Sequence, residues 1–309
     1  MSTVRHLTSM DDLSPAETVG LLKLAQKLKR DWNNGVRTRP LESQSLAMIF
    51  EKPSLRTRVT FEVGMTQLGG NAVYLGPGDI QVGKRESVGD IARNLSRWVQ
   101  AIMARTFSHA TVLELAANAT IPVINALSDH EHPCQALAFG QLVLERRGKL
   151  EGTNVTFVGD GNNVVHSLLL LTAKTGVSFT IACPQGYEPN GEVVERCRAL
   201  GGRCRVVRDP AEAVADADFI YTDVWASMGQ EAEAEKRKRD FAGYQVDEAL
   251  LAHAPKSALV THCLPAHRGE EITDGVIDGP RCAAFEEAEN RLHVQKAVLL
   301  YLMKREPLP

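Results

Sequence analysis

Residues 45–58 read SLAMIFEKPSLRTR, an apolar run followed closely by a serine, a threonine and two arginines. An apolar run of this length is typical of a buried strand, and the residues after it open a helix that extends toward Gly69 and Gly70. A strand followed by a helix is the repeating unit of a parallel sheet. The hydroxyl and guanidinium groups at the helix start form either a solvated turn or an anion site, and this stretch alone leaves both open.

The alternation of short apolar runs with amphipathic helical segments continues along the whole chain. Apolar runs of this kind, spaced by helices, favour parallel strands. The charged stretch 145–154 separates two series of them, and a final helical pattern covers 286–303. The sequence therefore predicts an α/β fold of two domains, each a parallel β-sheet flanked by helices. The predicted strands are 45–50, 72–75, 101–104 and 121–127, then 154–158, 178–182, 203–207, 219–222 and 258–263.

Composition narrows the function classes. The 309 residues are 44% hydrophobic and carry a net charge of −3, so no overall positive field would recruit nucleic acid or an anionic membrane. The six cysteines form no C-x-x-C pair, and no apolar leader precedes them. The longest apolar runs are shorter than the ~20 residues of a bilayer span. We therefore expect a cytoplasmic protein with reduced thiols that binds neither nucleic acid nor membrane.

The segment 230–240, QEAEAEKRKRD, contains a basic run. Glu233 precedes Arg237 by four residues, the favourable order for an ion pair on a helix surface. The pattern predicts a solvated helix rather than a nucleic-acid signal.

Polar residues follow successive predicted strands of the first half. Arg105 comes after strand 101–104, and His132 and Gln135 come after strand 121–127, at the start of a helix near Pro133. Ligands of open α/β sheets bind beyond the carboxyl ends of the strands. We therefore expect His132 and Gln135 to face the same cleft as Arg56 and Arg105.

In the second half, residues 159–163 read GDGNN between a strand and a helix. The motif matches a dinucleotide fingerprint only in part, because the third glycine is missing and Cys183-Pro184 stands where an acidic residue is expected. NAD binding remains an alternative. Asn163, at a helix N-terminus, suits a carboxylate.

Two further strand ends carry reactive side chains. Asp223 suits an ammonium group, and the SMG segment 227–229 offers a hydroxyl and a flexible turn. His262, Cys263 and His267 suggest a zinc site or a Cys/His nucleophile, but no second Cys/His pair completes a zinc set. The simpler alternative for His262 is a core histidine.

The ordered set of motifs resembles the ornithine carbamoyltransferases, a branch of the aspartate/ornithine transcarbamoylase family, over essentially the whole chain. S-x-R-T-R and H-P-x-Q are shared by transcarbamoylases in general, whereas S-M-G and H-C-L-P point to the ornithine-using branch. The motifs are S-x-R-T-R (54–58), Arg105, H-P-C-Q (132–135), G-D-G-N-N (159–163), D-x-W-x-S-M-G-Q (223–230), H-C-L-P (262–265) and A-E-N-R (288–291).

The resemblance implies transfer of a carbamoyl group from carbamoyl phosphate to the δ-amine of L-ornithine, in the cytoplasm and within arginine biosynthesis. It implies a carbamoyl phosphate-binding domain at 1–149, with a C-terminal helix at about 288–309 packing back on it, and an ornithine-binding domain at 150–287. It also implies a homotrimer that needs neither a metal nor a cofactor. Whether the cell runs the reaction toward or from citrulline stays open.

By similarity, one set of residues binds carbamoyl phosphate. Position 55 is Leu where many relatives carry Thr, so only its backbone N–H is expected to contribute. Gln81 is expected to reach into the site of an adjacent subunit. The phosphate would be held by Ser54, Leu55, Arg56, Thr57 and Arg105, the carbonyl oxygen by Thr57, Arg105, His132 and Arg291, and the NH2 group by Gln135 and the carbonyls of Cys263 and Leu264.

A second set is expected to bind ornithine: Asp223 and Ser227 at the α-ammonium, and Asn163 and the N–H of Met228 at the carboxylate. The residues expected to act in catalysis are Arg105, His132, Asp223, Cys263 and Arg291. A transcarbamoylase for putrescine or acetylornithine, a non-catalytic binding protein and a nicotinamide dehydrogenase remain as alternatives.

Overall fold

The computed structural model describes residues 4–226, 231–304 and 307–309. Its contacts divide the chain into two units, Met1–Gln141 with Asn290–Pro309, and Leu142–Glu289. These boundaries fall inside two helices, α6 (Pro133–Arg147) and α13 (Ala284–Leu299). The sequence suggests divisions near 149/150 and 287/288.

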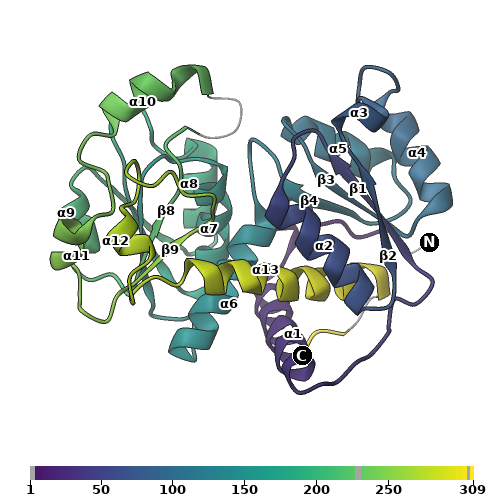
Figure 1. The fold of residues 1–309 in the computed structure, drawn as a ribbon, viewed down its shortest axis with the longest axis horizontal. Helices are drawn as coiled ribbons and strands as arrows, with labels where there is room; N and C mark the ends of the chain where they lie inside the picture. The colour runs from purple at the N-terminus through teal and green to yellow at the C-terminus, as the bar shows by residue number, and fades with distance from the viewer. Residues whose placement is uncertain (1–3, 227–230, 305–306) are drawn as a thin grey trace. The chain divides into compact units, whose positions relative to one another are not determined.

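The sheet of unit 1 contains four parallel strands in the order β2-β1-β3-β4 (Figure 1). All four were expected from the apolar runs, and five of the six residues of β1 are buried, as a central strand requires. The strands are β1 (Ser45–Phe50), β2 (Asn71–Leu75), β3 (Ala101–Arg105) and β4 (Val123–Leu127).

The helices of unit 1 lie on both faces of this sheet. The chain leaves β1 for β2 in one direction and then crosses back to β3, so right-handed crossovers place α2 on one face and α4 and α5 on the other. Accordingly, Ala47, Ile49 and Ile102 share a core with α4 and α5. The helices are η1 (Met10–Asp12), α1 (Pro15–Asn33), α2 (Leu55–Gln67), α3 (Pro77–Ile80), α4 (Val88–Trp98) and α5 (His109–Asn118).

The C-terminal helix packs on unit 1, as expected. A Cβ added at Gly64 of α2 would lie 3.4 Å from Cγ of Lys296, so the two helices are in close contact. Lys29 Nζ donates to Asn290 Oδ1 at 2.7 Å, and the Tyr301 hydroxyl donates to Glu17 Oε1 at 2.6 Å. The π-helical turn η3 (Leu300–Lys304) continues α13.

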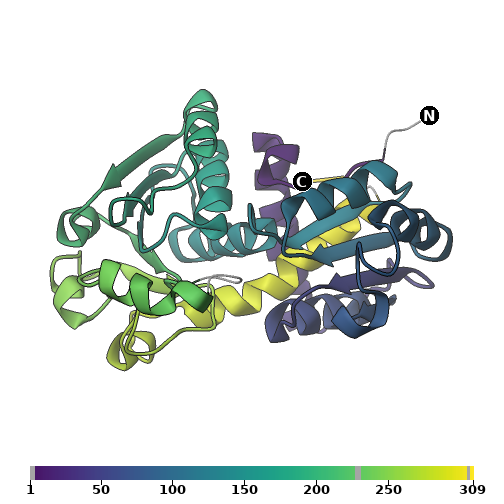
Figure 2. The same cartoon turned by 90° about the horizontal axis from the view of Figure 1, so that it is seen from above.

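Unit 2 contains a five-stranded parallel sheet in the order β7-β6-β5-β8-β9 (Figure 2 shows it from a second side). Val158, Ile220 and Val260 form its core with α9, α11 and α12. The strands are β5 (Asn154–Val158), β6 (Ser178–Ala182), β7 (Arg203–Val207), β8 (Phe219–Thr222) and β9 (Leu259–His262). The helices are α7 (Asn163–Thr175), α8 (Gly191–Ala199), α9 (Pro210–Val214), η2 (Glu231–Glu233), α10 (Ala234–Asp240), α11 (Glu248–Ala252) and α12 (Asp274–Ile277).

Within the described ranges, each helix is either too short or too polar to cross a bilayer.

Lys296 provides a test of the packing of α13. Its side chain is only 2% exposed, and Nζ donates to Gln67 Oε1 at 2.8 Å. Burial, assisted by the charge of Arg37, lowers the pKa of Lys296 to about 8. An exposed lysine in the unfolded chain keeps a pKa of about 10.4. Between these values the unfolded chain binds more protons, so the free energy of unfolding contributed by this group rises with pH.

We predict that Lys296→Met removes this contribution. Between pH of about 8 and 10, the free energy of unfolding of the variant, measured by urea denaturation, will rise less with pH than that of the wild type. Lys27→Met is the matched control, because Lys27 is exposed and pairs with Asp31 on the surface of α1. Identical pH slopes for the wild type and Lys296→Met would contradict the prediction.

Candidate functional site

The first candidate site lies at the carboxyl ends of β1 and β3 in unit 1. The chain runs from β1 to β2 on one side, whereas β3 and β4 lie on the other, so the strand order reverses at this pair. Such a switch point is where open α/β sheets bind ligands. Phe50 and Arg105, the last residues of the two strands, are register partners.

The helix that follows β1 presents its N-terminus at this place. Ser54 is the N-cap of α2, and its hydroxyl accepts a hydrogen bond from the Thr57 N–H at 3.3 Å. The N–H groups of Leu55 and Arg56 lie in the first turn, where the helix itself provides no carbonyl for them. The Leu55 side chain is 75% exposed and has no hydrogen-bond donor. The backbone N–H is therefore the group of Leu55 that could bind an anion.

Arg291 on α13 joins the first turns of two other helices of unit 1. It is 2% exposed; Nη1 donates to Gln135 Oε1 at 2.5 Å, and Nη2 donates to Thr57 Oγ1 at 3.3 Å. Three predicted site residues, far apart in the sequence, are therefore in direct contact.

His132 lies among the arginines of unit 1. Its side chain is buried, and its pKa is held well below the usual value, first by burial and then by the positive charges of Arg291, Arg105 and Arg56. The imidazole is therefore neutral and keeps one N–H donor. We call Arg56, Thr57, Arg105, His132, Gln135 and Arg291 the arginine cluster; three fixed positive charges around a neutral ring suit a dianion.

Gln81 lies at a different part of unit 1. It caps the C-terminus of α3 with φ 44°, and its carbonyl accepts from the N–H groups of Lys84 and Arg85 at 2.9 and 3.1 Å. Its side chain is exposed. The role predicted for it concerns a neighbouring subunit.

The second candidate site lies at the carboxyl ends of β5 and β8, the switch point of the unit 2 sheet. Asn162 is the N-cap of α7: Oδ1 accepts from the N–H of Val164 at 3.0 Å, and Nδ2 donates to Asp223 Oδ2 at 2.8 Å. Asn163, the residue predicted from the sequence, is the first residue of the helix and is half-buried. Sequence reasoning missed Asn162, although asparagine before a helix is a common capping signal.

Asp223 is the centre of this second site. It is 6% exposed and accepts three hydrogen bonds, from Asn162, from the N–H of Val224 at 2.8 Å and from Cys263 Sγ at 2.8 Å. The predicted carboxylate and thiol therefore lie together. Leu264 has φ 57° and precedes a cis peptide bond to Pro265. Ser227 and Met228 lie outside the described residues.

His262 is a core histidine, as the simpler interpretation held. The Leu264 N–H donates to Nδ1 at 2.8 Å, so the neutral ring carries its proton on Nε2, which pairs with Glu271 Oε1 at 3.0 Å. His262, Cys263 and Asp223 offer ligand atoms within 4.8 Å of one another. The ring nitrogens of His262 are already engaged, however, and the Cys263 thiol bonds to Asp223 rather than to a histidine.

The prediction of a solvated helix at 230–240 is wrong for Arg237. Its Nε lies 3.2 Å from Glu233 Oε2, as the spacing predicted, but Nη1 also donates to Asp160 Oδ2 and to the Trp225 carbonyl, each at 2.8 Å. The side chains of Arg237 and Asp160 are 8% and 10% exposed. Burial raises the pKa of Asp160 to about 6 against the opposing effect of Arg237. The spacing of charges within α10 gives no information about Asp160, which follows β5 in the sequence.

The GDGNN turn is explained by the chain's own packing. A Cβ added at Gly161 would lie 2.2 Å from the backbone nitrogen of Pro189, so only glycine fits there. The space beside this glycine is filled by the protein rather than left for a pyrophosphate.

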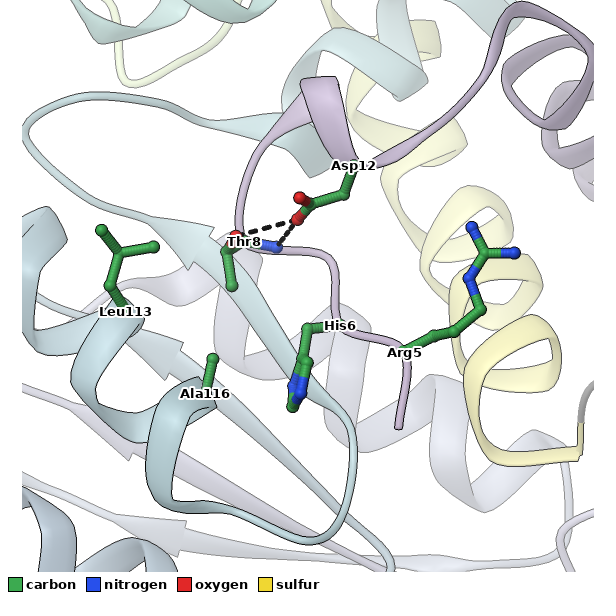
Figure 3. Close-up of a pocket in the computed structure, with 6 residues that line it drawn as sticks. All are labelled: Arg5, His6, Thr8, Asp12, Leu113 and Ala116. Carbon is green, nitrogen blue, oxygen red and sulfur yellow. Dashed lines mark hydrogen bonds between the residues drawn. The ribbon is translucent and has the colours of Figure 1, made fainter. Parts of the chain in front are cut away.

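A cavity of about 270 Å³ lies elsewhere in unit 1, under the N-terminal segment and against α5 (Figure 3). None of the predicted site residues lines it. Its lining consists of Arg5, His6, Thr8, Asp12, Leu113 and Ala116.

Two family models match the chain. The carbamoyl-P binding domain of aspartate/ornithine carbamoyltransferase matches residues 5–141, and the Asp/Orn binding domain of the same family matches residues 151–302. The chain belongs to the aspartate/ornithine carbamoyltransferase family.

Individual relatives agree over nearly their full length. An ornithine carbamoyltransferase of Anoxybacillus flavithermus is 54% identical, with 97% of this chain and 96% of the relative covered. One of Archaeoglobus fulgidus is 52% identical, with 98% and 99% covered. The solved structure of the Pyrococcus furiosus ornithine carbamoyltransferase aligns with a TM-score of 0.94 at 49% identity, covering 98% of this chain and 99% of that one.

The arginine cluster predicts a phosphate-binding defect that is specific to one arginine. Arg56→Ala should weaken binding of inorganic phosphate at least about tenfold, because a hydrogen bond to a charged group contributes about 1.5–3 kcal/mol. Isothermal titration calorimetry measures the affinity.

Arg58→Ala is the matched control two residues away. Arg58 pairs with Glu62 at 3.4 Å, and its guanidinium carbon lies 3.9 Å from the centroid of the Tyr74 ring. Wild-type affinity is expected for this variant. Equal losses in both variants would show that the general charge of α2, not Arg56, attracts the anion.

Proposed function

We propose that the protein transfers the carbamoyl group of carbamoyl phosphate to the δ-amine of L-ornithine and releases L-citrulline and phosphate. The observation that carries this proposal is the arginine cluster, in which three guanidinium groups surround one neutral, buried imidazole. The relatives that match the chain over nearly its full length bear the name of this activity.

Unit 1 binds carbamoyl phosphate in this proposal. Arg56 and Arg105 neutralise the phosphate, and the hydroxyls of Ser54 and Thr57 with the Leu55 N–H add donors at the start of α2. The N–H groups in the first turn of α2 and the guanidinium groups are fixed hydrogen-bond donors with positive charge. They therefore bind a dianion more favourably than water.

The carbonyl oxygen of the substrate needs donors where negative charge develops. His132, Arg105, Arg291 and Thr57 would serve this purpose, with the neutral ring of His132 donating one N–H. Gln135 Oε1, which accepts from Arg291, would also accept from the substrate NH2. The carbonyls of Cys263 and Leu264 would accept the remaining N–H.

Unit 2 binds ornithine in this proposal. Asp223 has three hydrogen bonds, and a carboxylate has about four acceptor positions, so one position is available for the α-ammonium group. The half-buried Asn163 at the start of α7 would hold the carboxylate. Ser227 and the N–H of Met228 are proposed partners of the same head group.

The reaction is direct transfer between the two substrates. The lone pair of the neutral δ-amine forms a bond to the carbamoyl carbon, and the electrons of the C=O bond move to the oxygen. The electrons on the oxygen of this tetrahedral intermediate then re-form the C=O bond as the bond to the phosphate oxygen breaks. The phosphate leaves with that electron pair and takes up the proton that the new nitrogen substituent loses. Proximity and stabilisation of the oxyanion supply most of the acceleration.

A homotrimer in which Gln81 completes the site of a neighbour is also part of this proposal. Leu55, Val59 and Val63 are 75%, 46% and 38% exposed and recur every four residues on α2. Val73 on the edge strand β2 is 44% exposed. An exposed apolar stripe of this kind is typical of a subunit interface.

A cytoplasmic location fits the free thiols of all six cysteines. A role in arginine biosynthesis is supported by the relatives from Pseudomonas aeruginosa, 51% identical, and Campylobacter jejuni, 36% identical, which are both described as anabolic.

A colorimetric citrulline assay tests the reaction. With carbamoyl phosphate and a panel of L-ornithine, putrescine and acetylornithine, we expect ornithine to be preferred by about a hundredfold or more. The reason is that the buried Asp223 carboxylate lacks a cationic partner when the head group is missing, and an uncompensated buried charge costs about 3–5 kcal/mol. Arg56→Ala should abolish product formation and leave the far-UV circular dichroism unchanged.

Comparable rates with putrescine would reassign the substrate. An unchanged rate in Arg56→Ala would contradict the role proposed for Arg56 and the start of α2 in the reaction. Complete absence of transfer with each amine would favour a non-catalytic binding protein.

Mixed trimers test the role of Gln81. Gln81→Ala and Arg56→Ala should each be strongly impaired alone. If Gln81 acts in the neighbour's site, a trimer that contains both variants has one fully native site, so about one third of the wild-type rate returns. The measurement is citrulline formation by mixed trimers separated with two affinity tags. Mixed trimers without recovered activity would place Gln81 in its own chain's site or outside the machinery.

A further inference from the structure

The N-terminal segment of unit 1 extends the sheet beyond β4. The Leu7 N–H donates to the Val123 carbonyl at 2.9 Å, and the Asn125 N–H donates to the Leu7 carbonyl at 2.7 Å. The following residues fold into η1, whose shape is held by Asp12: its Oδ2 accepts from the N–H and hydroxyl of Thr8 at 2.6 and 2.8 Å (Figure 3). We call residues 7–12 the N-terminal clamp.

The clamp holds one buried carboxylate. Glu131 is 1% exposed; Oε1 accepts from the Ser9 hydroxyl, and Oε2 accepts from the Met10 N–H at 3.0 Å. Both oxygens of the carboxylate are thus bonded to adjacent residues of the clamp, so its position and orientation are fixed together.

The backbone around Glu131 is held by the same region. The Ser128 N–H donates to the Glu131 carbonyl at 2.9 Å, which closes the turn between β4 and α6. Asn125 Nδ2 donates to the Thr8 carbonyl at 2.9 Å, which ties this turn again to the clamp. Residue 131 therefore has its side chain bonded to the distant N-terminal clamp and its backbone bonded to the turn just before it.

His132 is the next residue, and it belongs to the arginine cluster. Because a peptide unit is planar, a fixed Glu131 limits the positions that the His132 backbone can take. A buried carboxylate that lost its donors would be strongly unfavourable, so the contact with the clamp resists displacement. Placement of a catalytic donor within a fraction of an ångström affects the rate far more than it affects the fold.

We infer that Glu131, through Ser9 and Met10 of the N-terminal clamp, is a positioning residue that aims His132 at the carbonyl oxygen of the substrate. The inference rests on the proposed function. The N-terminal segment is then part of the catalytic machinery, although none of its residues is expected to touch a substrate.

Ser9→Ala and Glu131→Gln test the inference. Each should lower kcat about tenfold and change both KM values less than about threefold, because His132 acts on charge that develops in the transition state. Ser14→Ala is the control: it removes the N-cap bond of α1 to the Glu17 N–H, 3.2 Å, in the same part of the chain. It should lower the melting temperature and leave kcat unchanged.

A double-mutant cycle separates positioning from general destabilisation. In a His132→Ala background, Ser9→Ala and Glu131→Gln should have no further effect on kcat, because the donor that they position is absent. The same tenfold loss in both backgrounds would overturn the inference, as would wild-type kcat in both single variants. If Glu131→Gln does not fold, Ser9→Ala alone still tests the inference.

A spectroscopic readout keeps this inference distinct from the proposed function. In protein labelled with ¹⁵N-histidine, the ring signals of His132, assigned by their loss in His132→Ala, should shift in Ser9→Ala and not in Ser14→Ala. If the wild type makes no citrulline, the proposed function fails, and the signals still decide whether the clamp positions His132. Unshifted signals in Ser9→Ala would overturn the inference by themselves.

Discussion

The structure depends most on three guanidinium charges, one buried and two half-buried, beside one buried imidazole in unit 1. Guanidinium groups stay charged at any physiological pH, and like charges at short range repel. Such an arrangement persists only where the backbone holds it. Arg105 ends a central strand, Arg56 sits in the first turn of α2, and Arg291 is bonded to Thr57 and Gln135. The guanidinium groups still repel one another in the absence of a ligand, which lowers the stability of the folded protein. A bound dianion removes this repulsion, so the same arrangement favours its binding.

The site at the second sheet has the opposite charge, because it is built around carboxylates. The charge of Asp223 helps to raise the pKa of Asp160, and of these two carboxylates it is Asp160 to which Arg237 donates. One carboxylate is therefore compensated by the protein, and the other is left with hydrogen-bond donors but without a cationic side chain among its described partners. This balance suits a ligand with one positive head group. Both sites lie at strand-order reversals, where a parallel sheet leaves room for loops and helix starts.

Local patterns predicted nearly all of the fold, because the central strands are mostly buried and apolar, while the edge strands β2 and β7 are partly exposed. The expected strand 121–127 begins two residues later at Val123, since Pro122 has no N–H for the ladder. For the first site, Thr57, His132 and Gln135 lie together with arginines from other elements of unit 1, and their binding roles stay predictions. The burial of Arg237, the bond from Asn162 to Asp223 and the bonds of Glu131 could not be predicted, because each depends on a partner far away in the sequence. His262 stayed ambiguous for the same reason: Glu271, which engages its ring, is recognisable only once β9 and the following loop are folded.

Gly161 shows how a short motif can carry the right residues for an unrelated reason. Its missing side chain makes room for the backbone of Pro189, so the turn after β5 has the outline of a nucleotide-binding loop while the protein itself occupies the gap. A pattern search that scores glycine spacing would report this turn as a false positive. To tell a nucleotide-binding turn from a structural one in this architecture, one must know whether solvent or polypeptide fills the space beside the second glycine.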